Sequence, residues 1–298
     1  MALRQMDDND SAGPRSSLLP VRTGIWLFPA AGARELVDAA VAAEEGGFDE
    51  VWIADEGVMR EPLVVLSAAA AKTSRIKLGI GITTPVLRHP GALGSSMATL
   101  DELSGGRAIL GLGVGGALTL DPFGLKAEKP VALIRDAIRI ARAVAGRKVA
   151  AGYDLPEHAM PPRDVPIFVA SRGEQINRLA SREADGVFFS GVNLDRVEET
   201  LCWARSVRPI HVALFPSVRY RPDAPVDPAA LRGDPADVAN GLRRLVERHH
   251  PETIGLCLVD GDPLDVMVPR AIDTLKHFRE FYDRADGDPG ETGKRWLT

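Results

Sequence analysis

Residues 77–116, KLGIGITTPVLRHPGALGSSMATLDELSGGRAILGLGVGG, decide the fold of this chain. The stretch reads as a buried strand, a polar turn, a helix and a second buried strand that runs into a glycine-rich loop. Both strands should end at the same rim of a barrel, where flexible backbone and hydroxyl side chains gather. Such a rim suits a flat cofactor that carries a phosphate group, so the stretch bears on function as well as on fold.

The same unit of a short apolar run followed by an amphipathic helix repeats eight times along the chain. The expected pairs of strand and helix are 24–28 with 33–45, 50–54 with 62–73, 76–82 with 91–103, 108–112 with 131–145, 165–170 with 174–183, 186–189 with 194–204, 210–215 with 235–248, and 253–259 with 265–284. Strands that alternate with helices indicate a parallel sheet covered by helices. Apolar runs without polar alternation are typical of strands buried on both faces. Eight units predict an α/β fold of the closed (β/α)8 TIM barrel type. A doubly wound sheet is the alternative, but the first strand ends in FPAAG and lacks the glycine fingerprint of that fold.

Length and composition are those of an ordinary globular protein, with 298 residues, 45% hydrophobic and 26% charged. We expect one barrel domain over residues 21–284 between flexible tails at 1–20 and 285–298. Proline-rich connections at 147–164 and 219–234 interrupt the repeat.

The start of the chain lacks the pattern of a signal peptide and no apolar run reaches about 20 residues, which predicts a cytoplasmic protein without a membrane anchor. A net charge of −5 argues against a nucleic-acid partner. The two cysteines lack metal-ligand spacing and the six histidines are mostly scattered, so no metal site is expected.

The active site of a (β/α)8 barrel lies at the carboxyl ends of its strands. This rule selects Phe28, Asp55, Glu56 and the segments 81–85, 111–116, 171–173 and 190–191. Most of these residues are glycines or small hydroxyl residues, and few are strong acids, bases or nucleophiles. A hydrolase or an aldolase should place a nucleophile, a metal cluster or a lysine here. The rim instead favours a cofactor that brings its own reactivity.

The segments GFDEVWIADEG, LRHP, ATLDELSGGRAILGLGVG and VPIFVASRGEQINRLASREADGVFFSG resemble the bacterial luciferase-like superfamily. Within that superfamily they are most similar to the branch that uses the deazaflavin coenzyme F420, typified by methylenetetrahydromethanopterin reductase. The resemblance implies a luciferase-like barrel and an oxidoreductase that transfers hydride to or from a small organic molecule. It also implies a homodimer that buries helices two and three, and the alanine-rich run 66–73 suits close helix packing.

In this family the third strand ends in a cis peptide bond that does not involve proline, and the matching bond here is Gly81–Ile82. The resemblance implies that the resulting bulge presses on the cofactor ring from behind and bends it. An ordinary strand whose glycines ease helix packing is the alternative. Thr83 is placed to hydrogen-bond to ring heteroatoms. The loop after the fourth strand is expected to line the ring and its ribityl chain through backbone contacts of Val114, Gly115 and Thr119.

The segment Ser171-Arg172-Gly173 lies between a strand and a helix that is expected to begin near Glu174. Free backbone N–H groups and the helix dipole at such a terminus bind phosphate. By resemblance this is the phosphate site of the cofactor, to which Ala170 also contributes. Gly191, at the end of the next strand, should face the same phosphate. Simple capping of the helix by Ser171 is the alternative.

Asp55 and Glu56 end the second strand, and the resemblance places Asp55 close to the cofactor ring, with Glu56 where relatives often have histidine. A carboxylate beside a flat apolar ring is partly desolvated, which raises its pKa and suits it to proton transfer. Both residues are therefore candidate catalytic residues. The alternative is that Asp55 caps the following helix or pairs with Arg60.

Two other functions remain open on the same fold. FMN in place of F420 would make the protein a flavin reductase or monooxygenase; the long anionic tail of F420 needs a basic exit, for which Arg172 and Arg88 are the candidates. A flavin-binding relative without catalytic activity is the other possibility, since an acid of the sugar-phosphate-oxidising relatives is replaced by Gly116. The connection after the seventh strand also lacks the helical insertion that relatives usually carry.

Overall fold

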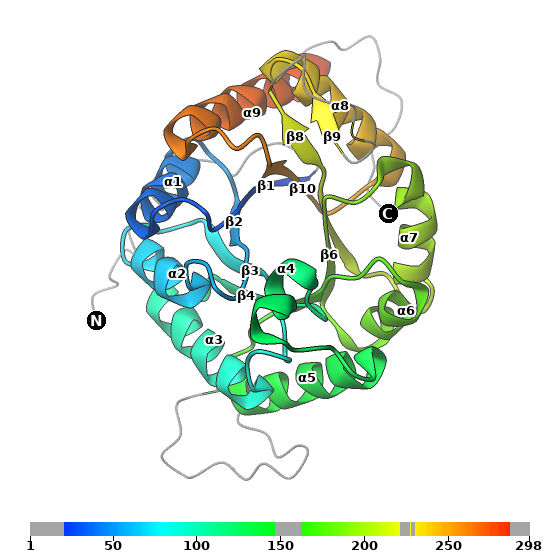
Figure 1. Ribbon diagram of the computed structural model, residues 1–298. Helices are drawn as coiled ribbons and strands as arrows, with labels where there is room; N and C mark the ends of the chain where they lie inside the picture. The colour runs from blue at the N-terminus through cyan, green and yellow to red at the C-terminus, as the bar shows by residue number, and fades with distance from the viewer. Residues whose placement is uncertain (1–20, 147–161, 221–226, 228–229, 287–298) are drawn as a thin grey trace, which may run out of the picture.

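The strands of the computed structural model close into a parallel barrel with helices around it (Figure 1). The structure describes residues 21–146, 162–220, 227 and 230–286. Strands pair in the order β1-β2-β3-β4-β5-β6-β7-β10, and β10 pairs with β1, which closes the barrel. The barrel strands are β1 (Arg22–Leu27), β2 (Glu50–Ile53), β3 (Lys77–Thr83), β4 (Ala108–Leu112), β5 (Ile167–Val169), β6 (Gly186–Ser190), β7 (His211–Phe215) and β10 (Thr253–Leu258). The predicted (β/α)8 barrel is confirmed.

The helices that cover the barrel begin and end where local sequence signals place them. They are α1 (Ala33–Glu45), α2 (Pro62–Ala70), α3 (Pro90–Ser104), α5 (Pro130–Ala145), α6 (Glu174–Glu183), α7 (Val197–Ala204), α8 (Pro235–His249) and α9 (Leu264–Asp286). Proline opens four of them at the first helical position, where a missing N–H costs nothing. At the other end of α3, Gly105 adopts a left-handed conformation with φ of 71°.

Four short elements lie outside the predicted repeat: α4 (Ala117–Leu120), η1 (Asp121–Phe123), β8 (Ser217–Arg219) and β9 (Ala230–Arg232). A fifth, η2 (Leu194–Arg196), forms the first turn of the predicted helix 194–204. Pro216 separates β7 from β8, and β8 continues the pairing with β10 before β9 pairs with β8. The proline-rich connection thus adds two short strands to the barrel rim. The predicted N-terminal tail and most of the segment 147–164 lie outside the described residues, as does the C-terminal tail beyond Asp286. Among the described helices, none has the length and apolar character to cross a membrane.

Aromatic side chains fill the lower interior of the barrel. Trp52 is fully buried, and its ring centroid lies 4.4 Å from that of Phe188. A Cβ atom at Gly79 would overlap the Trp52 ring, so only glycine fits this strand position. Because large and small residues alternate across the interior, the barrel is packed below its rim. A cavity opens above this packed interior, at the carboxyl ends of the strands.

A buried carboxyl group lies at the other end of the barrel, below Trp52. Glu50 is 0% exposed and accepts hydrogen bonds from Trp52 Nε1 (3.0 Å) and Thr253 Oγ1 (3.1 Å). His211 Nε2 lies 2.8 Å from the same threonine hydroxyl, and Arg22 Nη1 lies 3.8 Å from Glu50. Burial raises the pKa of Glu50, and it lowers the pKa of His211 to about 4. The network therefore favours a protonated carboxyl and a neutral imidazole.

Replacing Glu50 with glutamine should stabilise the protein increasingly as the pH rises. The pKa of Glu50 is raised on folding, so its contribution to stability is complete below the ordinary glutamate pKa and is lost as the pH rises through the folded value. Glutamine keeps the shape and an acceptor for Trp52 but cannot ionise. The difference in free energy of unfolding between Glu50→Gln and wild type, measured by urea denaturation from pH 4.5 to 8, should grow with pH. A constant difference would contradict this.

Candidate active site

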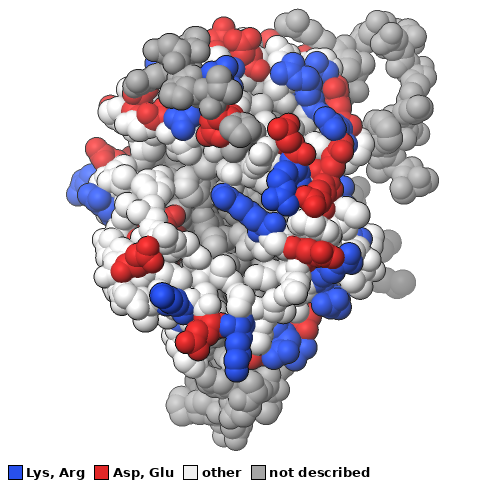
Figure 2. Space-filling model, turned by 45° about the vertical axis from the view of Figure 1, so that its right-hand side comes forward, with Lys and Arg blue, Asp and Glu red and all other residues white. Residues whose placement is uncertain are grey.

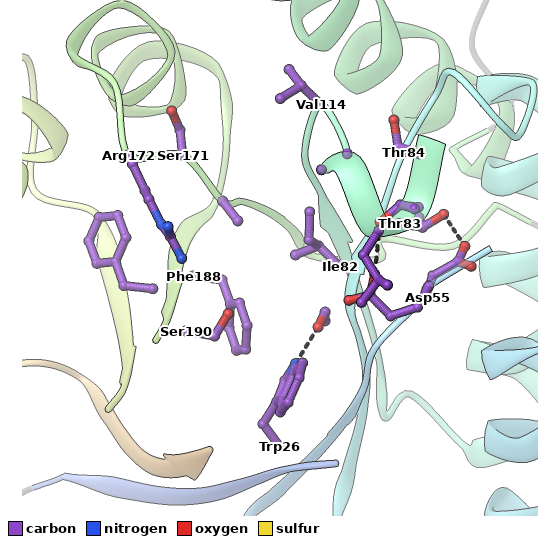
Figure 3. Close-up of a pocket in the computed structure, with 18 of the residues that line it drawn as sticks. Trp26, Asp55, Ile82, Thr83, Thr84, Val114, Ser171, Arg172, Phe188 and Ser190 are labelled. Atoms are coloured by element: carbon purple, nitrogen blue, oxygen red, sulfur yellow. Dashed lines mark hydrogen bonds between the residues drawn. The ribbon is translucent and has the colours of Figure 1, made fainter. Parts of the chain in front are cut away.

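A cavity of about 520 Å³ opens at the carboxyl ends of β2 to β6 (Figure 3). The predicted site residues that line it are Asp55, Glu56, Gly81, Ile82, Thr83, Val114, Gly115, Thr119, Ala170, Ser171 and Arg172. Gly173 and Gly191 do not line it but lie beside it, through contacts with Ser171 and Arg172. Thr84 and Ser190, from the predicted rim segments 81–85 and 190–191, also line it, whereas Trp26, Phe188, Phe189 and Val192 are lining residues that the sequence did not single out. The rim rule therefore located the cavity correctly.

The end of β3 bulges into this cavity. The Gly81–Ile82 peptide bond is cis, as the resemblance predicts. Pairing between β3 and β4 shifts register between Ile80 and Thr83, and the Gly81 carbonyl accepts a hydrogen bond from Trp26 Nε1. Ile82 is partly exposed, whereas the other residues of β3 after Lys77 are buried, and its side chain points into the open space (Figure 3). The bulge thus presents an apolar surface to whatever occupies the cavity.

Asp55 is held by three hydrogen bonds beside this bulge. Thr83 Oγ1 donates to it at 2.6 Å, Arg88 Nε at 2.8 Å and the Gly57 backbone N–H at 3.3 Å. Arg88 also binds Glu61 at 3.0 Å, so its charge is shared between two carboxylates. Asp55 is 3% exposed. Both Asp55 oxygens already have partners, which favours a role in holding the rim together, and a catalytic role for Asp55 stays a prediction.

Glu56 differs from its neighbour because only one described residue donates a hydrogen bond to it, Thr119 from Oγ1 at 2.8 Å. Burial raises the pKa of Glu56, the Thr119 hydrogen bond opposes that rise, and the charge of Asp55 adds to it. The direction agrees with the expectation from the sequence for a rim carboxylate, and a catalytic role for Glu56 stays a prediction. A carboxyl group at the edge of an apolar cavity that keeps its proton to a higher pH than an ordinary glutamate is suited to proton transfer.

Replacing Thr119 with valine should raise the pKa of Glu56 further. The hydroxyl donates to the ionised carboxylate and so stabilises the charged form, and valine removes that donor while keeping the volume. The carboxyl ¹³C shift of labelled glutamate followed against pH gives the pKa, and Glu56→Gln assigns the resonance. An unchanged or lowered pKa in Thr119→Val would contradict the hydrogen bond as a determinant of this group.

The loop after β4 is partly helical rather than extended. Ala117–Leu120 forms the single turn α4, and Gly115 has φ of 80°, which lets the chain enter that turn. The Thr119 side chain donates to Glu56, and the contacts of the Thr119 backbone with a cofactor stay a prediction. An added Cβ atom at Gly116 would meet nothing within 4 Å, so the cavity has room beside this residue.

Residues 171–173 form a loop at the N-terminus of α6, on the opposite side of the cavity from the bulge (Figure 3). Ser171 Oγ accepts from the Gly173 backbone N–H at 3.0 Å. The fully buried Asn177 donates from Nδ2 to the carbonyls of Ser171 (3.2 Å) and Gly173 (2.9 Å), which fixes the loop. Arg172 extends over the cavity, and its Nη2 makes a 3.4 Å hydrogen bond to the Gly191 carbonyl. Among the described residues, no carboxylate forms a salt bridge with Arg172. The helix terminus and this guanidinium together favour an anion.

The family comparison agrees with this geometry. The model of a family described as luciferase-like monooxygenase matches residues 15–208. The chain belongs to the luciferase-like monooxygenase family. The matched range includes β1 to β6, the bulge at Gly81–Ile82 and the 171–173 loop, so every predicted site residue falls inside it.

This luciferase-like protein is also similar to curated relatives and to solved structures. It is 36% identical over 173 residues to a 5,10-methylenetetrahydromethanopterin reductase of Methanolobus tindarius, covering 56% of this chain and 53% of the relative. It is 37% identical over 187 residues to an F420-dependent glucose-6-phosphate dehydrogenase of Kineococcus radiotolerans, covering 56% of each chain. The chain spans about half the length of the curated relatives it matches. The coenzyme F420-dependent tetrahydromethanopterin reductase from Methanopyrus kandleri has the same fold, with a TM-score of 0.68, 24% identity and coverage of 87% and 99% of the two chains.

Three residues have contacts in this luciferase-like site that the sequence did not predict. Trp26 looks like an ordinary strand residue, and only the folded chain brings its N–H to Gly81. Asn177 is a polar residue on the buried face of an amphipathic helix, a signal that could have been noticed. Arg88 was a candidate for the anionic tail of F420, but Asp55 and Glu61 occupy its guanidinium.

Proposed function

We propose that the protein is an oxidoreductase that binds coenzyme F420 and transfers hydride between it and a small organic substrate. One observation carries this proposal: an apolar bulge at Ile82 and the N-terminus of α6 with Arg172 face each other across one cavity. A molecule with a flat ring at one end and a phosphate at the other fits that arrangement. The F420-dependent relatives in the same family support the choice of cofactor.

The cavity offers separate surroundings for the two parts of such a cofactor. Apolar contacts for a ring come from Ile82, Val114 and Ala170. Two hydroxyl residues, Thr83 and Thr84, line the same cavity. The backbone N–H groups at the start of α6 and the guanidinium of Arg172 provide positive charge for a phosphate. When bound and reduced, the cofactor supplies a hydride from its ring carbon.

Glu56 is the residue to which we assign proton transfer. Its carboxyl group faces the cavity and holds its proton more tightly than an ordinary glutamate, because burial raises its pKa. A substrate that accepts a hydride at one atom takes the Glu56 proton at the neighbouring atom, and the substrate thereby gains two electrons and two hydrogens. The apolar surroundings exclude water from the reacting face.

Charge is the observation that favours FMN as an alternative cofactor. Arg172 is the single cation among the described residues that line the cavity, and Arg88 is already paired. Figure 2 shows a hollow in the surface with basic and acidic side chains interspersed beside it rather than a continuous basic field. A short cofactor with one phosphate needs only the helix terminus and Arg172, whereas the longer anionic tail of F420 gains little extra attraction here.

A titration of the protein freed of cofactor decides between the two cofactors. F420 and FMN are added separately, and binding is followed by ring absorbance and fluorescence. The proposal expects F420 to bind at least about tenfold more tightly, a difference of roughly 1.4 kcal/mol. Tighter binding of FMN would support the alternative, and binding of neither would overturn the proposed function.

Turnover separates an enzyme from a cofactor-binding relative without catalytic activity. The protein loaded with reduced cofactor is mixed with a panel of ketones, aldehydes, imines and conjugated alkenes, and reoxidation is followed by absorbance without oxygen. Gly116 leaves open space where sugar-phosphate-oxidising relatives carry an acid by resemblance, so glucose 6-phosphate is expected to be a poor substrate in the reverse direction. Binding without turnover across the panel would favour the inactive relative.

We further propose that two copies of the chain associate through α2 and α3. Val64 is 66% exposed, and Ala68 and Ala71 on the same face of the helix region are also exposed. Small apolar residues spaced by three and four positions let two helices approach closely. The molecular mass in solution, measured by sedimentation equilibrium, tests this directly.

A further inference from the structure

The side of the cavity below and beside the bulge is apolar and largely aromatic. Two members of the aromatic cluster in the barrel interior, Trp26 and Phe188, also line the cavity. Phe28 packs beside Trp26. We call Trp26, Phe28 and Phe188 the aromatic wall. Figure 3 shows Trp26 below the open space, with Phe188 on one side of it and Ile82 on the other.

The orientation of Trp26 is fixed by its contacts. Its indole N–H donates to the Gly81 carbonyl, and its ring lies 6.0 Å from that of Phe28 at an interplanar angle of 40°. Because the N–H is already used, Trp26 offers a ligand only its apolar π surface. Trp26 is 8% exposed, and it is one of the residues that line the cavity.

Charged groups of the cavity are placed away from the aromatic wall or are already engaged. Asp55 is bound by Thr83 and Arg88, Glu56 accepts from Thr119, and Arg172 lies at the N-terminus of α6. Asp55, Glu56 and Arg172 are the charged residues among the described residues that line the cavity. A highly hydroxylated substrate placed here would lose hydrogen bonds to water without replacement.

We propose that the aromatic wall binds a planar, conjugated, apolar part of the substrate, and that Trp26 determines this specificity. The inference rests on the proposed function, because it names the substrate class of the same site. A flat π system stacks on the fixed indole face, which favours planar over puckered rings of equal size. The bulge at Ile82 then remains free for the cofactor ring.

Two methyl ketones with the same number of ring carbons test this preference. Acetophenone carries a planar aromatic ring, and cyclohexyl methyl ketone carries a puckered saturated one. Affinities are measured by ligand-detected NMR on the full chain. Acetophenone should bind about two- to tenfold more tightly to wild type, as expected for an aromatic pair. Burial of apolar surface alone would not favour the aromatic ketone, so equal affinities or a preference for the saturated ketone would overturn the inference.

Variants of Trp26 separate specificity from a merely structural role. Trp26→Leu keeps an apolar side chain and should lose the preference for acetophenone, whereas Trp26→Phe keeps an aromatic face and should retain it. Trp203→Phe, on α7 and outside the cavity, is the matched control and should leave both affinities unchanged. A preference that survives in Trp26→Leu would overturn the inference, because the ratio of two affinities does not depend on overall stability.

The same measurement with saturating F420 or FMN distinguishes the two proposals. Acetophenone bound at the aromatic wall should remain bound when the cofactor is present. Displacement by the cofactor would mean that acetophenone occupies the ring position, which overturns the inference and leaves the proposed function intact. Failure of both cofactors to bind would overturn the proposed function, while the comparison of ketones without cofactor would still decide whether the aromatic wall selects planar rings.

Discussion

Replacing Ser171 with aspartate should weaken binding of the phosphate-bearing cofactor by about 100-fold or more. Ser171 lies in the loop at the N-terminus of α6, where backbone N–H groups and Arg172 favour an anion. A carboxylate at residue 171 would occupy that position and repel a phosphate. Opposed like charges cost several kcal/mol, and 100-fold corresponds to only about 2.8 kcal/mol. The measurement is a fluorescence titration of the protein, freed of cofactor, with FMN and F420.

Two controls make this result specific to the phosphate. Ser171→Ala removes the acceptor for the Gly173 N–H without adding charge and should weaken binding by no more than about tenfold, the scale of one hydrogen bond. Riboflavin has the ring of FMN but no phosphate, so Ser171→Asp should leave its affinity nearly unchanged. An equal loss for FMN and riboflavin would mean that residues 171–173 support the ring rather than bind the phosphate.

The barrel could be predicted because each of its units carries a local signal. The bounds of α1, α6 and β4 match the prediction, since each stands between clear breaks in the apolar pattern. By contrast, β8 and β9 have three residues each, too few to display a period. They are strands only because β10 and then β8 offer hydrogen-bonding edges in the folded molecule, and that pairing is not encoded locally.

The position of the candidate site could be predicted from the sequence, but most of the contacts between its residues could not. Knowing that a barrel binds ligands at the carboxyl ends of its strands was enough to select the glycines and hydroxyl residues of the rim. The arginine that binds Asp55 could not be predicted in this way. Arg88 stands 33 positions further along the chain, and Arg60, the nearer candidate, donates to the Ala30 carbonyl instead. Resemblance supplied the cis bond at Gly81–Ile82, whereas the hydrogen bond from Trp26 emerged only from the fold.

Arg107 is a second residue whose importance follows from the folded contacts. It belongs to the LDELSGGR segment, for which the sequence indicated a family but no individual role. The side chain is buried, and all its nitrogens donate: Nε to the Ser104 carbonyl at 2.7 Å, and the two terminal nitrogens to groups of the α2–β3 connection at 2.9–3.0 Å. One guanidinium thus satisfies the end of α2, the entry to β3 and the end of α3.

Replacing Arg107 with methionine should therefore lower the free energy of unfolding by at least about 3 kcal/mol, because several buried carbonyls lose their donor and each unsatisfied group costs about 1–3 kcal/mol. Arg107→Lys keeps the charge but offers fewer donors in a different geometry, so it should recover only part of the loss. Arg178→Ala, which breaks an exposed pair with Glu174, is the surface control and should cost about 0.5 kcal/mol or less. Urea denaturation gives all three values. If Arg107→Met unfolded at the wild-type urea concentration, the guanidinium would be dispensable, and packing of α2 against α3 alone would have to hold the strand that carries the bulge.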